Sequence, residues 1–353
     1  MIVLCTHVSP SDEGGVASSA RFFVSSLSQH HSFIWVKVPT HEANPYMVYL
    51  GLDHDVCRTF NDERLLIDYL KKRKIANIIV HFVTFSVDFG LNLKRAIPSS
   101  KLILNFRGND ATLNVFREEN CLEIYINKSD LLVYVSDHLK RLVETRYESA
   151  VGKGIVVNNS PKSDGEIITL ERKDRLSRIP VLQYGAIGFW KWKKGLSVLL
   201  EYLRNNPQFA KSFRLYGEID ARDPNLLALY EAVVQECGMS PIKAIAPKDV
   251  PRILGGIDVL VIPSLAEGVP NVLLEGYTNG CFIVASNIPG IQEIVEKAGH
   301  GITFQPGEAF ALESAINELE RDREAIGRYL SDIPRIKDLL NVNPWNEINQ
   351  ALA

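Results

Sequence analysis

IDVLVIPSLAEGVPNVLLEGY is the sequence of residues 257–277, and it places a buried strand, a loop and a helix one after another. Five of its first six residues are apolar, four of them β-branched, and a glycine and a proline bound the run, which is typical of a central parallel strand. Pro270 suits the first turn of a helix and Gly280 suits its end. Glu267 is therefore expected in a strand-to-helix loop, and Glu275 about one turn inside the helix.

The start of this helix is expected to bind an anion or a hydroxyl group. Backbone N–H groups around Gly268, Val269 and Asn271 have no acceptor within the helix, so they can hold a phosphate or a sugar hydroxyl. Glu267 and Glu275 lie eight positions apart. One carboxylate for each hydroxyl-bearing ring is a reasonable way to bind a nucleotide sugar.

The stretch resembles the Glu-x7-Glu element of the family 4 retaining glycosyltransferases. The resemblance continues through residues 280–286 and 289–295, which are similar to that family's next strand and its Gly-x-x-Glu loop. Together these segments form a specific match, whereas two glutamates at this spacing alone would not. The resemblance implies an α/β fold with two Rossmann-like doubly wound domains that face each other across a cleft, the GT-B fold.

Composition favours an ordinary globular chain. It has 353 residues, of which 46% are hydrophobic and 23% charged, and a net charge of −3 that gives no reason to expect nucleic acid as a partner. The five cysteines form no Cys-x-x-Cys pair, and no cluster of Cys and His predicts a metal site. Without a signal peptide or a membrane-length apolar run, we expect a cytoplasmic protein, with peripheral contact at the inner membrane face left open.

Strand-like and helix-like segments alternate in both halves, as in doubly wound sheets. In the first half, strands are predicted at 2–7, 33–38, 78–82, 102–106, 131–136 and 154–157, and helices at 16–29, 62–72, 91–95, 121–127 and 138–146. In the second, strands are predicted at 179–184, 213–216, 242–246, 258–262 and 282–285, and helices at 196–205 and 226–236. We expect an acceptor-side domain at 1–160, a nucleotide-sugar-binding domain at 178–330, and a C-terminal helix at about 335–353 that packs back on the first domain.

The resemblance gives the two glutamates their roles. Glu275 would accept hydrogen bonds from the ribose hydroxyls, since a carboxylate suits a vicinal diol. Glu267 would meet the donor sugar near its reacting face. The alternatives are a glutamate stabilised by the helix dipole for Glu275 and a solvent-exposed loop carboxylate for Glu267.

A basic segment at 184–195, YGAIGFWKWKKG, is similar to the family's Gly-Arg…Lys-Gly diphosphate-binding stretch. Lys194 matches the lysine, and Ala186 stands where the family has an arginine after the first glycine. Lys191 is then expected to supply the missing charge from a longer loop. A solvated basic turn is the alternative for these lysines.

Two loops of the first domain also resemble the family. Gly14 and Gly15 match its Gly-Gly loop near the donor phosphate, although a plain tight turn would also fit. Arg107 replaces the histidine of its His-Gly-x-Asp element, where it would pair with the donor phosphate or with an acidic sugar. Asp110 would hold Arg107 or brace the turn, and His81 would face the cleft or belong to the core.

The predicted activity is transfer of a sugar from a UDP- or GDP-sugar to an acceptor hydroxyl with retention, without a cofactor or a metal. The acceptor is expected to be a saccharide or a lipid-linked saccharide, in bacterial surface polysaccharide or glycolipid assembly. The resemblance assigns catalysis to Glu267, Lys194 and Arg107, donor binding to Glu275, Gly268, Val269, Asn271, Lys191, Gly15 and Gly14, and an acceptor-side or cleft position to His81 and Asp110. A nucleotide-sugar 2-epimerase and a non-catalytic sugar-nucleotide-binding relative stay open.

Overall fold

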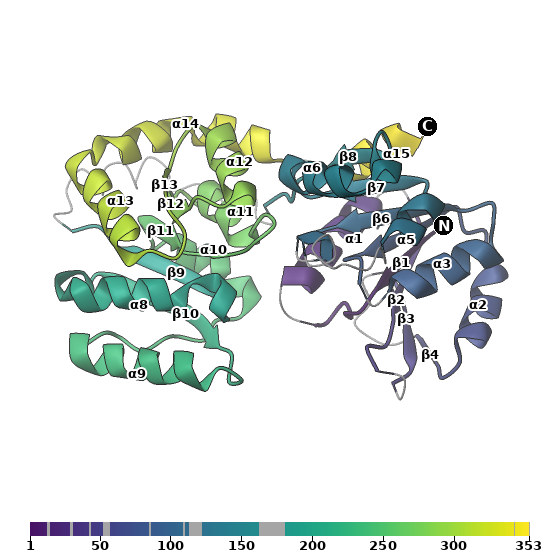
Figure 1. Ribbon diagram of the computed structural model, residues 1–353, viewed down its shortest axis with the longest axis horizontal. Helices are drawn as coiled ribbons and strands as arrows, with labels where there is room; N and C mark the ends of the chain where they lie inside the picture. The colour runs from purple at the N-terminus through teal and green to yellow at the C-terminus, as the bar shows by residue number, and fades with distance from the viewer. Residues whose placement is uncertain are drawn as a thin grey trace. The chain divides into compact units, whose positions relative to one another are not determined.

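The computed structural model describes residues 1–12, 15–28, 31–41, 44–51, 57–84, 86–108, 110–112, 122–161, 181–341 and 343–352. They belong to two compact units. The first is Met1–Ser160 with Val342–Ala353, and the second is Pro161–Asn341. In Figure 1 the first runs from purple to teal, and its last helix is yellow. The segment between the predicted domains, residues 161–177, lies outside the described residues from position 162 onward.

The first unit contains a mixed sheet whose described strands follow the order β4-β3-β2-β1-β5-β6-β7-β8. The pairs from β2 through β1 to β8 are parallel, and β3 and β4 are added antiparallel at one edge. The strands are β1 Ile2–Thr6, β2 Phe33–Lys37, β3 Tyr46–Leu50, β4 Arg58–Phe60, β5 Asn77–His81, β6 Lys101–Phe106, β7 Leu131–Tyr134 and β8 Gly154–Val156. The edge strands β3 and β4 were not predicted.

The described helices of the first unit are α1 Gly15–Ser28, α2 Glu63–Lys71, α3 Val87–Ala96, α5 Glu123–Lys128, α6 Asp137–Arg146 and α15 Pro344–Leu352. Four of them, α1, α3, α5 and α6, each follow a parallel strand along the chain, while α2 follows β4 and α15 follows α14. Polar caps explain where two of them begin, since Asp62 accepts a hydrogen bond from the amide of Arg64 and Ser136 accepts one from Leu139.

The last helix, α15, belongs to the first unit. It packs against α1, β7 and β8, and Ile348 is fully buried in the core beneath α1. The side chain of Trp345 lies outside the described residues. The predicted start near 335 is wrong, because α14 continues to Leu340 within the second unit and the terminal helix begins only at Pro344.

The second unit has a sheet that is parallel throughout its described strands, in the order β10-β9-β11-β12-β13. The strands are β9 Tyr184–Trp190, β10 Phe213–Ile219, β11 Val259–Ile262, β12 Phe282–Ser286 and β13 Ile302–Phe304. The predicted strand at 179–184 is displaced, because the strand begins at Tyr184. The strand predicted at 242–246 is reduced to one bridge between Lys243 and Tyr216.

The helices of the second unit are α8 Leu196–Asn205, α9 Pro224–Cys237, α10 Val250–Leu254, α11 Asn271–Thr278, α12 Pro289–Ala298, α13 Ala309–Arg321 and α14 Glu324–Leu340. The helix α8 packs against α9 and α13, whereas α11 packs against α10 and α14. Right-handed crossovers that leave β9 and β11 in opposite directions put α8 and α11 on opposite faces of the sheet.

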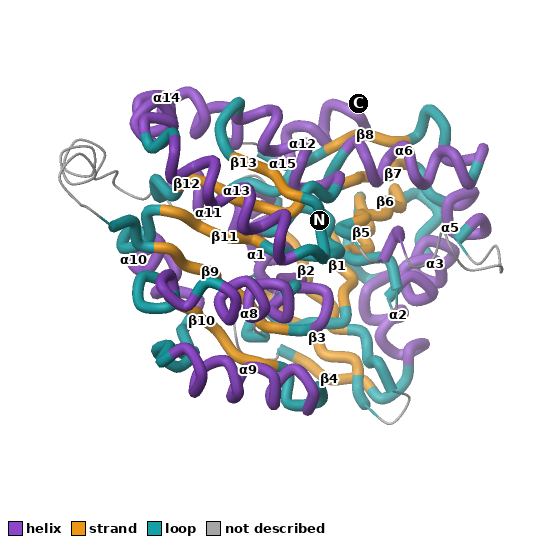
Figure 2. The backbone as a smooth tube through the Cα atoms, turned by 60° about the vertical axis from the view of Figure 1, so that its left-hand side comes forward, coloured by secondary structure: helices purple, strands orange, loops and turns teal. Residues whose placement is uncertain are grey.

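Each sheet therefore reverses its strand order once near the middle. The reversal lies between β1 and β5 in the first unit and between β9 and β11 in the second, and the tube in Figure 2 shows both pairs of strands side by side. In open α/β sheets, ligands bind outside the carboxyl ends of the strands at such points. The prediction of an α/β fold with Rossmann-like units is confirmed.

Candidate functional site

The crevice of the second unit opens where β9 and β11 part. These strands pair at Tyr184 with Val259 and at Gly185 with Leu260, and β9 then continues beside β10 as far as Trp190. The residues after β9 and after β11 therefore form two loops at the carboxyl edge of the sheet. They are the segments 191–195 and 263–270 that the sequence singled out.

Backbone contacts lock the two loops together. The carbonyl of Lys193 accepts hydrogen bonds from the amides of Leu265, at 2.7 Å, and Ala266, at 3.4 Å. Gly195 has a φ of +68°, and a Cβ atom there would lie 1.8 Å from the carbonyl oxygen of Pro263. Only glycine fits this position, because it alone combines left-handed backbone with such a close approach.

This arrangement brings Lys194 and Glu267 together. Their Nζ and Oε1 atoms are 2.6 Å apart, and the side chains are 24% and 12% exposed. Burial lowers the pKa of Lys193, the charge of Glu267 raises it, and the charges of Lys194 and Lys191 lower it further. The ammonium groups of Lys193 and Lys194 thus both interact with the Glu267 carboxylate, and Lys191 lies close enough to affect Lys193.

Two helices begin at the same loop. The helix α11 starts at Asn271 after the cap Pro270, and Gly290 in the first turn of α12 lies so close that a Cβ atom there would be 1.6 Å from the carbonyl oxygen of Gly268. The positive ends of both helix dipoles therefore reach the loop that carries Glu267, as an anion site requires. Residues 289–293 were expected in a loop but form the first turn of α12.

Glu275 lies in the second turn of α11 and is half-buried. Its neighbour Gly276 packs on β11 so tightly that a Cβ atom there would be 2.5 Å from Leu260 Cδ2, which fixes the rotation of the helix. Of the predicted donor contacts, Asn271 is the first helical residue, while Gly268 and Val269 precede the helix and are buried. Glu275 and Glu267 therefore flank one helix start.

The structure shows the surroundings of Ala186, which stands where the family has an arginine. Ala186 is fully buried within β9, so its position faces the interior and has no access to a ligand. The last glycine of the strand is Gly188, and Phe189 after it is 47% exposed. The ammonium group of Lys191 lies 5.1 Å from the centroid of the Phe189 ring. Lys191 follows the strand directly, so no lengthened loop is needed to place it.

A second polar group lies at the carboxyl edge of the first sheet. His81, the last residue of β5, is fully buried, and its Nδ1 lies 3.0 Å from Asn105 Nδ2 on β6. Arg107 donates from Nη1 to Asn105 Oδ1 at 3.3 Å and to the carbonyl of Val157 at 3.4 Å, and from Nη2 to Asn159 Oδ1. Burial lowers the pKa of Arg107 to about 10, opposed by the charge of Asp110, so the guanidinium keeps its charge at neutral pH.

Asp110 braces the backbone around this group. Its carboxylate accepts hydrogen bonds from the amides of Val83 at 2.9 Å, Arg107 at 3.0 Å and Gly108 at 2.7 Å. Burial raises the pKa of Asp110, while these amides and the Arg107 charge act in the opposite direction. Asp110 was expected either to hold the Arg107 side chain or to brace the turn, and these hydrogen bonds to backbone amides fit the second role.

Phe82, between His81 and Val83, has a φ of +65°. A left-handed conformation in an aromatic residue costs on the order of 1–3 kcal/mol and persists only where surrounding contacts hold it. Here the amide of Phe82 donates to the carbonyl of Asn105 at 3.1 Å, and its ring contacts His7 at a centroid distance of 5.5 Å. Strain of this kind at the end of a central strand is typical of functional sites.

The loop after β1 is held by charge. Asp12 accepts hydrogen bonds from the hydroxyl and amide of Ser9 and pairs with Lys37 at 3.1 Å, and Arg21 donates to the carbonyls of Pro10 and Asp12. Gly15 is the first residue of α1, and its φ is not positive. Gly14 lies outside the described residues. The predicted role of the glycine pair stays a prediction.

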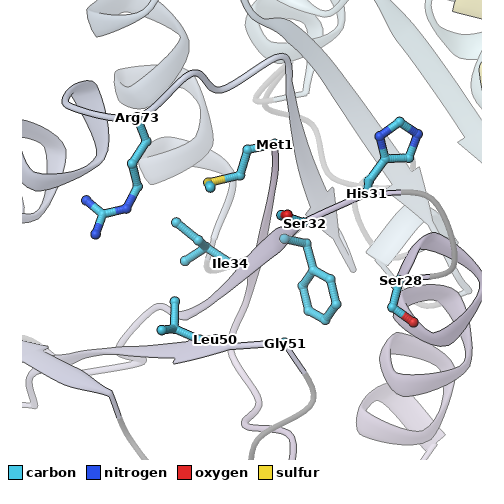
Figure 3. Close-up of a pocket in the computed structure, with 9 residues that line it drawn as sticks. Met1, Ser28, His31, Ser32, Ile34, Leu50, Gly51 and Arg73 are labelled. Atoms are coloured by element: carbon cyan, nitrogen blue, oxygen red, sulfur yellow. The ribbon is translucent and has the colours of Figure 1, made fainter.

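Other features of the described residues lie apart from these two groups. No set of three or more His, Cys, Asp or Glu side chains is placed there to hold a metal ion, and no helix combines the length and apolarity needed to cross a bilayer. A hollow of about 570 Å³ lies at the amino end of β1 and β2, between Met1, Ile34, Leu50 and Arg73 (Figure 3). It contains none of the predicted site residues.

Residues 181–322 match the model of the glycosyl transferases group 1 family. This match covers β9, Lys194, Glu267 and Glu275. This part of the chain is therefore similar to the glycosyl transferases group 1 family.

Parts of the chain are also similar to named glycosyltransferases. The amylovoran biosynthesis glycosyltransferase AmsK of Erwinia amylovora is 28% identical over 143 residues, which are 36% of this chain and 33% of that protein. The UDP-Gal:alpha-D-GlcNAc-diphosphoundecaprenol alpha-1,3-galactosyltransferase of Escherichia coli is 37% identical over 73 residues, which are 21% of this chain and 18% of that protein. In both cases the chain spans less than two thirds of the relative's length.

The crystal structure of Anabaena HepE in complex with UDP resembles the whole chain. The TM-score is 0.70, at 16% identity, over 99% of each chain. The likeness shows the GT-B fold for this chain.

The predicted site residues fall into two sets. Lys194, Lys191, Glu267 and Glu275 belong to the second unit, at or beside the loops after β9 and β11, and His81, Arg107 and Asp110 lie around one strand edge of the first. Sequence reasoning gave no role to Asn105, Asn159 or Phe82, whereas Gly290 is the glycine of the stretch that resembles the Gly-x-x-Glu loop.

Proposed function

We propose that this chain is a retaining glycosyltransferase that moves a sugar from a nucleoside-diphosphate sugar to an acceptor hydroxyl. The observation that carries the proposal is the pair of Lys194 and Glu267, 2.6 Å apart at the start of two helices. A cationic crevice suits a diphosphate, and a carboxylate within it suits the hydroxyls of the attached sugar.

In this proposal Lys194 and Lys191 bind the diphosphate and neutralise its charge as it leaves. The amides of Gly268, Val269 and Asn271 add hydrogen bonds at the start of α11. Glu275, one turn further along, accepts hydrogen bonds from the ribose hydroxyls. Charge stabilisation of a leaving group is most effective when donors are already in place, and the locked loops meet this condition.

Glu267 would contact the sugar without forming a covalent bond to it. The departing diphosphate takes the proton of the acceptor hydroxyl on the same face, so the protein mainly positions the reactants. No metal ion is needed in this scheme, because the lysines and helix termini supply the positive charge. Arg107 would meet the donor phosphate or an acidic sugar from the first unit.

We infer a hexose donor and a saccharide or lipid-linked saccharide acceptor, in the assembly of a bacterial surface polysaccharide or glycolipid. The names of two relatives support this setting, one an amylovoran biosynthesis enzyme and the other a galactosyltransferase that acts on a diphosphoundecaprenol-linked sugar. The UDP bound by HepE makes UDP-sugars the first donors to try. The proposed location is the cytoplasm, with contact at the inner membrane face.

Thermal shifts with UDP, GDP, ADP and CMP test the donor class, because a ligand that binds the folded state raises Tm by mass action. We expect one diphosphate to stabilise wild-type protein and to have less effect on Lys194→Met. Incubation with the matching sugar nucleotide alone then separates the reactions. Slow hydrolysis supports the transferase, an epimerised sugar nucleotide supports the epimerase, and binding without turnover over a broad acceptor panel supports a binding protein.

A further inference from the structure

The imidazole of His81 has one nitrogen in a hydrogen bond and one without a partner. The pairing of β5 with β6 sets His81 beside Asn105, and Nδ1 lies 3.0 Å from the Asn105 amide nitrogen. Nε2 is buried and has no hydrogen-bond partner within the described residues. Buried polar groups in native proteins are nearly always bonded, so this nitrogen needs an explanation, and an atom of a bound ligand is one.

Arg107 determines which way the Asn105 amide points. A guanidinium group only donates hydrogen bonds, so the Asn105 atom 3.3 Å from Arg107 Nη1 must be the oxygen. The amide nitrogen of Asn105 then faces His81 and donates to Nδ1. Arg107 is itself held by Asn159 and by the carbonyl of Val157, so the orientation is fixed from outside the pair.

The consequence for His81 is a single tautomer. Because Nδ1 accepts a hydrogen bond it carries no proton, and a neutral imidazole must then carry its proton on Nε2. Burial lowers the pKa of His81 well below its ordinary value, and the charges of Arg107 and His7 lower it further, which keeps the ring neutral. A ring in this state donates from Nε2 and cannot take up a proton there.

We infer that Asn105 is a positioning residue that fixes His81 as a neutral Nε2–H donor, and that this N–H bonds an oxygen atom of the bound substrate. The second statement rests on the proposed function, whereas the first does not. The oxygen belongs to a sugar hydroxyl or to a phosphate. His81 therefore binds substrate and does not act as a general base.

Histidine-labelled protein tests the first statement without any substrate. Long-range ¹H–¹⁵N correlation spectra of the full chain distinguish protonated from bare ring nitrogens, and His81→Gln identifies the His81 signals by their loss. We expect a protonated Nε2 and a bare Nδ1 from pH 6 to 8. A bare Nε2 in wild-type protein would overturn the inference.

Two substitutions of Asn105 test the cause. Asn105→Asp presents only acceptors, so His81 should become protonated on Nδ1. Asn105→Ala removes the donor, and a mixture of tautomers is expected, which keeps the test open if the aspartate variant does not fold. Asn158→Ala, a change to another buried asparagine in the same unit, should leave the His81 signals unchanged. Persistence of the wild-type tautomer in both Asn105 variants refutes the role of Asn105.

Kinetics with the sugar nucleotide found by thermal shift test the second statement. His81→Gln retains an N–H at a similar distance and should keep kcat/KM within a few-fold, whereas His81→Phe should lower it at least tenfold. Binding of two ligands to His81→Phe distinguishes the two oxygens. Loss of a phosphate contact should weaken binding of both the isolated nucleoside diphosphate and the complete sugar nucleotide, whereas loss of a sugar contact should weaken binding of the sugar nucleotide alone. If wild-type protein shows the expected His81 tautomer but His81→Phe keeps full activity, the substrate contact is refuted and the role of Asn105 is not.

Discussion

The pair of Lys194 and Glu267 predicts opposite effects for two substitutions. Lys194→Met removes an ammonium group from the proposed diphosphate site, so binding of free UDP should weaken. Glu267→Gln keeps the shape of the side chain but removes a negative charge beside the same site, so binding of free UDP should strengthen. Turnover of the sugar nucleotide should fall in both variants, because Glu267 is proposed to hold the sugar.

The distances set the size of both effects. Lys194 Nζ is 2.6 Å from Glu267 Oε1, so a phosphate oxygen bonded to the same ammonium lies about 5 Å from the carboxylate. Repulsion at that distance is about 0.8 kcal/mol at the dielectric constant of water and about 3 kcal/mol at an effective value of 20. Glu267→Gln should therefore tighten UDP binding about fourfold or more. A charged hydrogen bond is worth roughly 1.5–3 kcal/mol, so Lys194→Met should weaken binding roughly 10- to 150-fold.

Titration calorimetry with UDP at low salt measures both changes. The ion pair of Arg204 and Glu236 offers a matched control, because it has a similar distance of 2.7 Å in the same unit but is largely exposed. Arg204→Met and Glu236→Gln should leave UDP affinity unchanged. Weaker UDP binding by Glu267→Gln, or unchanged binding by Lys194→Met, would show that the diphosphate does not lie in this crevice.

Three further outcomes are expected. Glu275→Ala should weaken nucleotide binding by roughly 1.5–3 kcal/mol in calorimetry, whereas Glu231→Ala, at an exposed site on α9, should not; equal affinities would remove the ribose contact. Gly195→Ala and Gly238→Ala both require left-handed backbone, at φ of +68° and +61°, which costs about 1–2 kcal/mol. Only Gly195 adds a backbone clash, so its variant should lose clearly more stability in urea, and equal losses would contradict the close contact. Burial lowers the pKa of His81, so below about pH 6.5 the unfolded state binds a proton that the folded state does not, and stability should fall by up to about 1.4 kcal/mol per pH unit. His81→Gln should lack this part of the slope, and identical slopes between pH 5 and 7 would contradict it.

The crevice of the second unit could be predicted because its signals are local. A strand, a loop with Glu267 and a helix with Glu275 follow one another within 21 residues, and the family resemblance covered the same stretch. The bounds predicted for β9 are wrong because the contacts that determine them are not local in the sequence. The predicted strand ends at 184, but Gly185 lies inside β9, where a Cβ atom would be 2.5 Å from Ile257 Cδ1. That requirement arises from tertiary packing and leaves no local pattern.

The polar group of the first unit could be predicted only in part. His81 and Arg107 each follow an apolar run, which predicts the end of a strand. Their link through Asn105 depends on the register of β5 against β6, and the contact with Asn159 joins residues 52 positions apart. Neither follows from spacing along the chain. The left-handed conformation of Phe82 also gives no sequence signal, because the contacts that hold it come from Asn105 and His7.

The charges of the crevice explain why a glutamate belongs among lysines even before a substrate binds. Lys191, Lys193 and Lys194 lie within four consecutive positions that also include Trp192. Among the described residues, Glu267 is the carboxylate paired with Lys194 at close range. Burial already lowers the pKa of Lys193, and the charge of Glu267 opposes that shift, so the carboxylate stabilises ammonium groups that repel one another. In the proposed function a bound diphosphate would supply the same compensation with more charge. Glu267 would then be available to the sugar hydroxyls, which would link occupation of the phosphate site to the placement of the reacting ring.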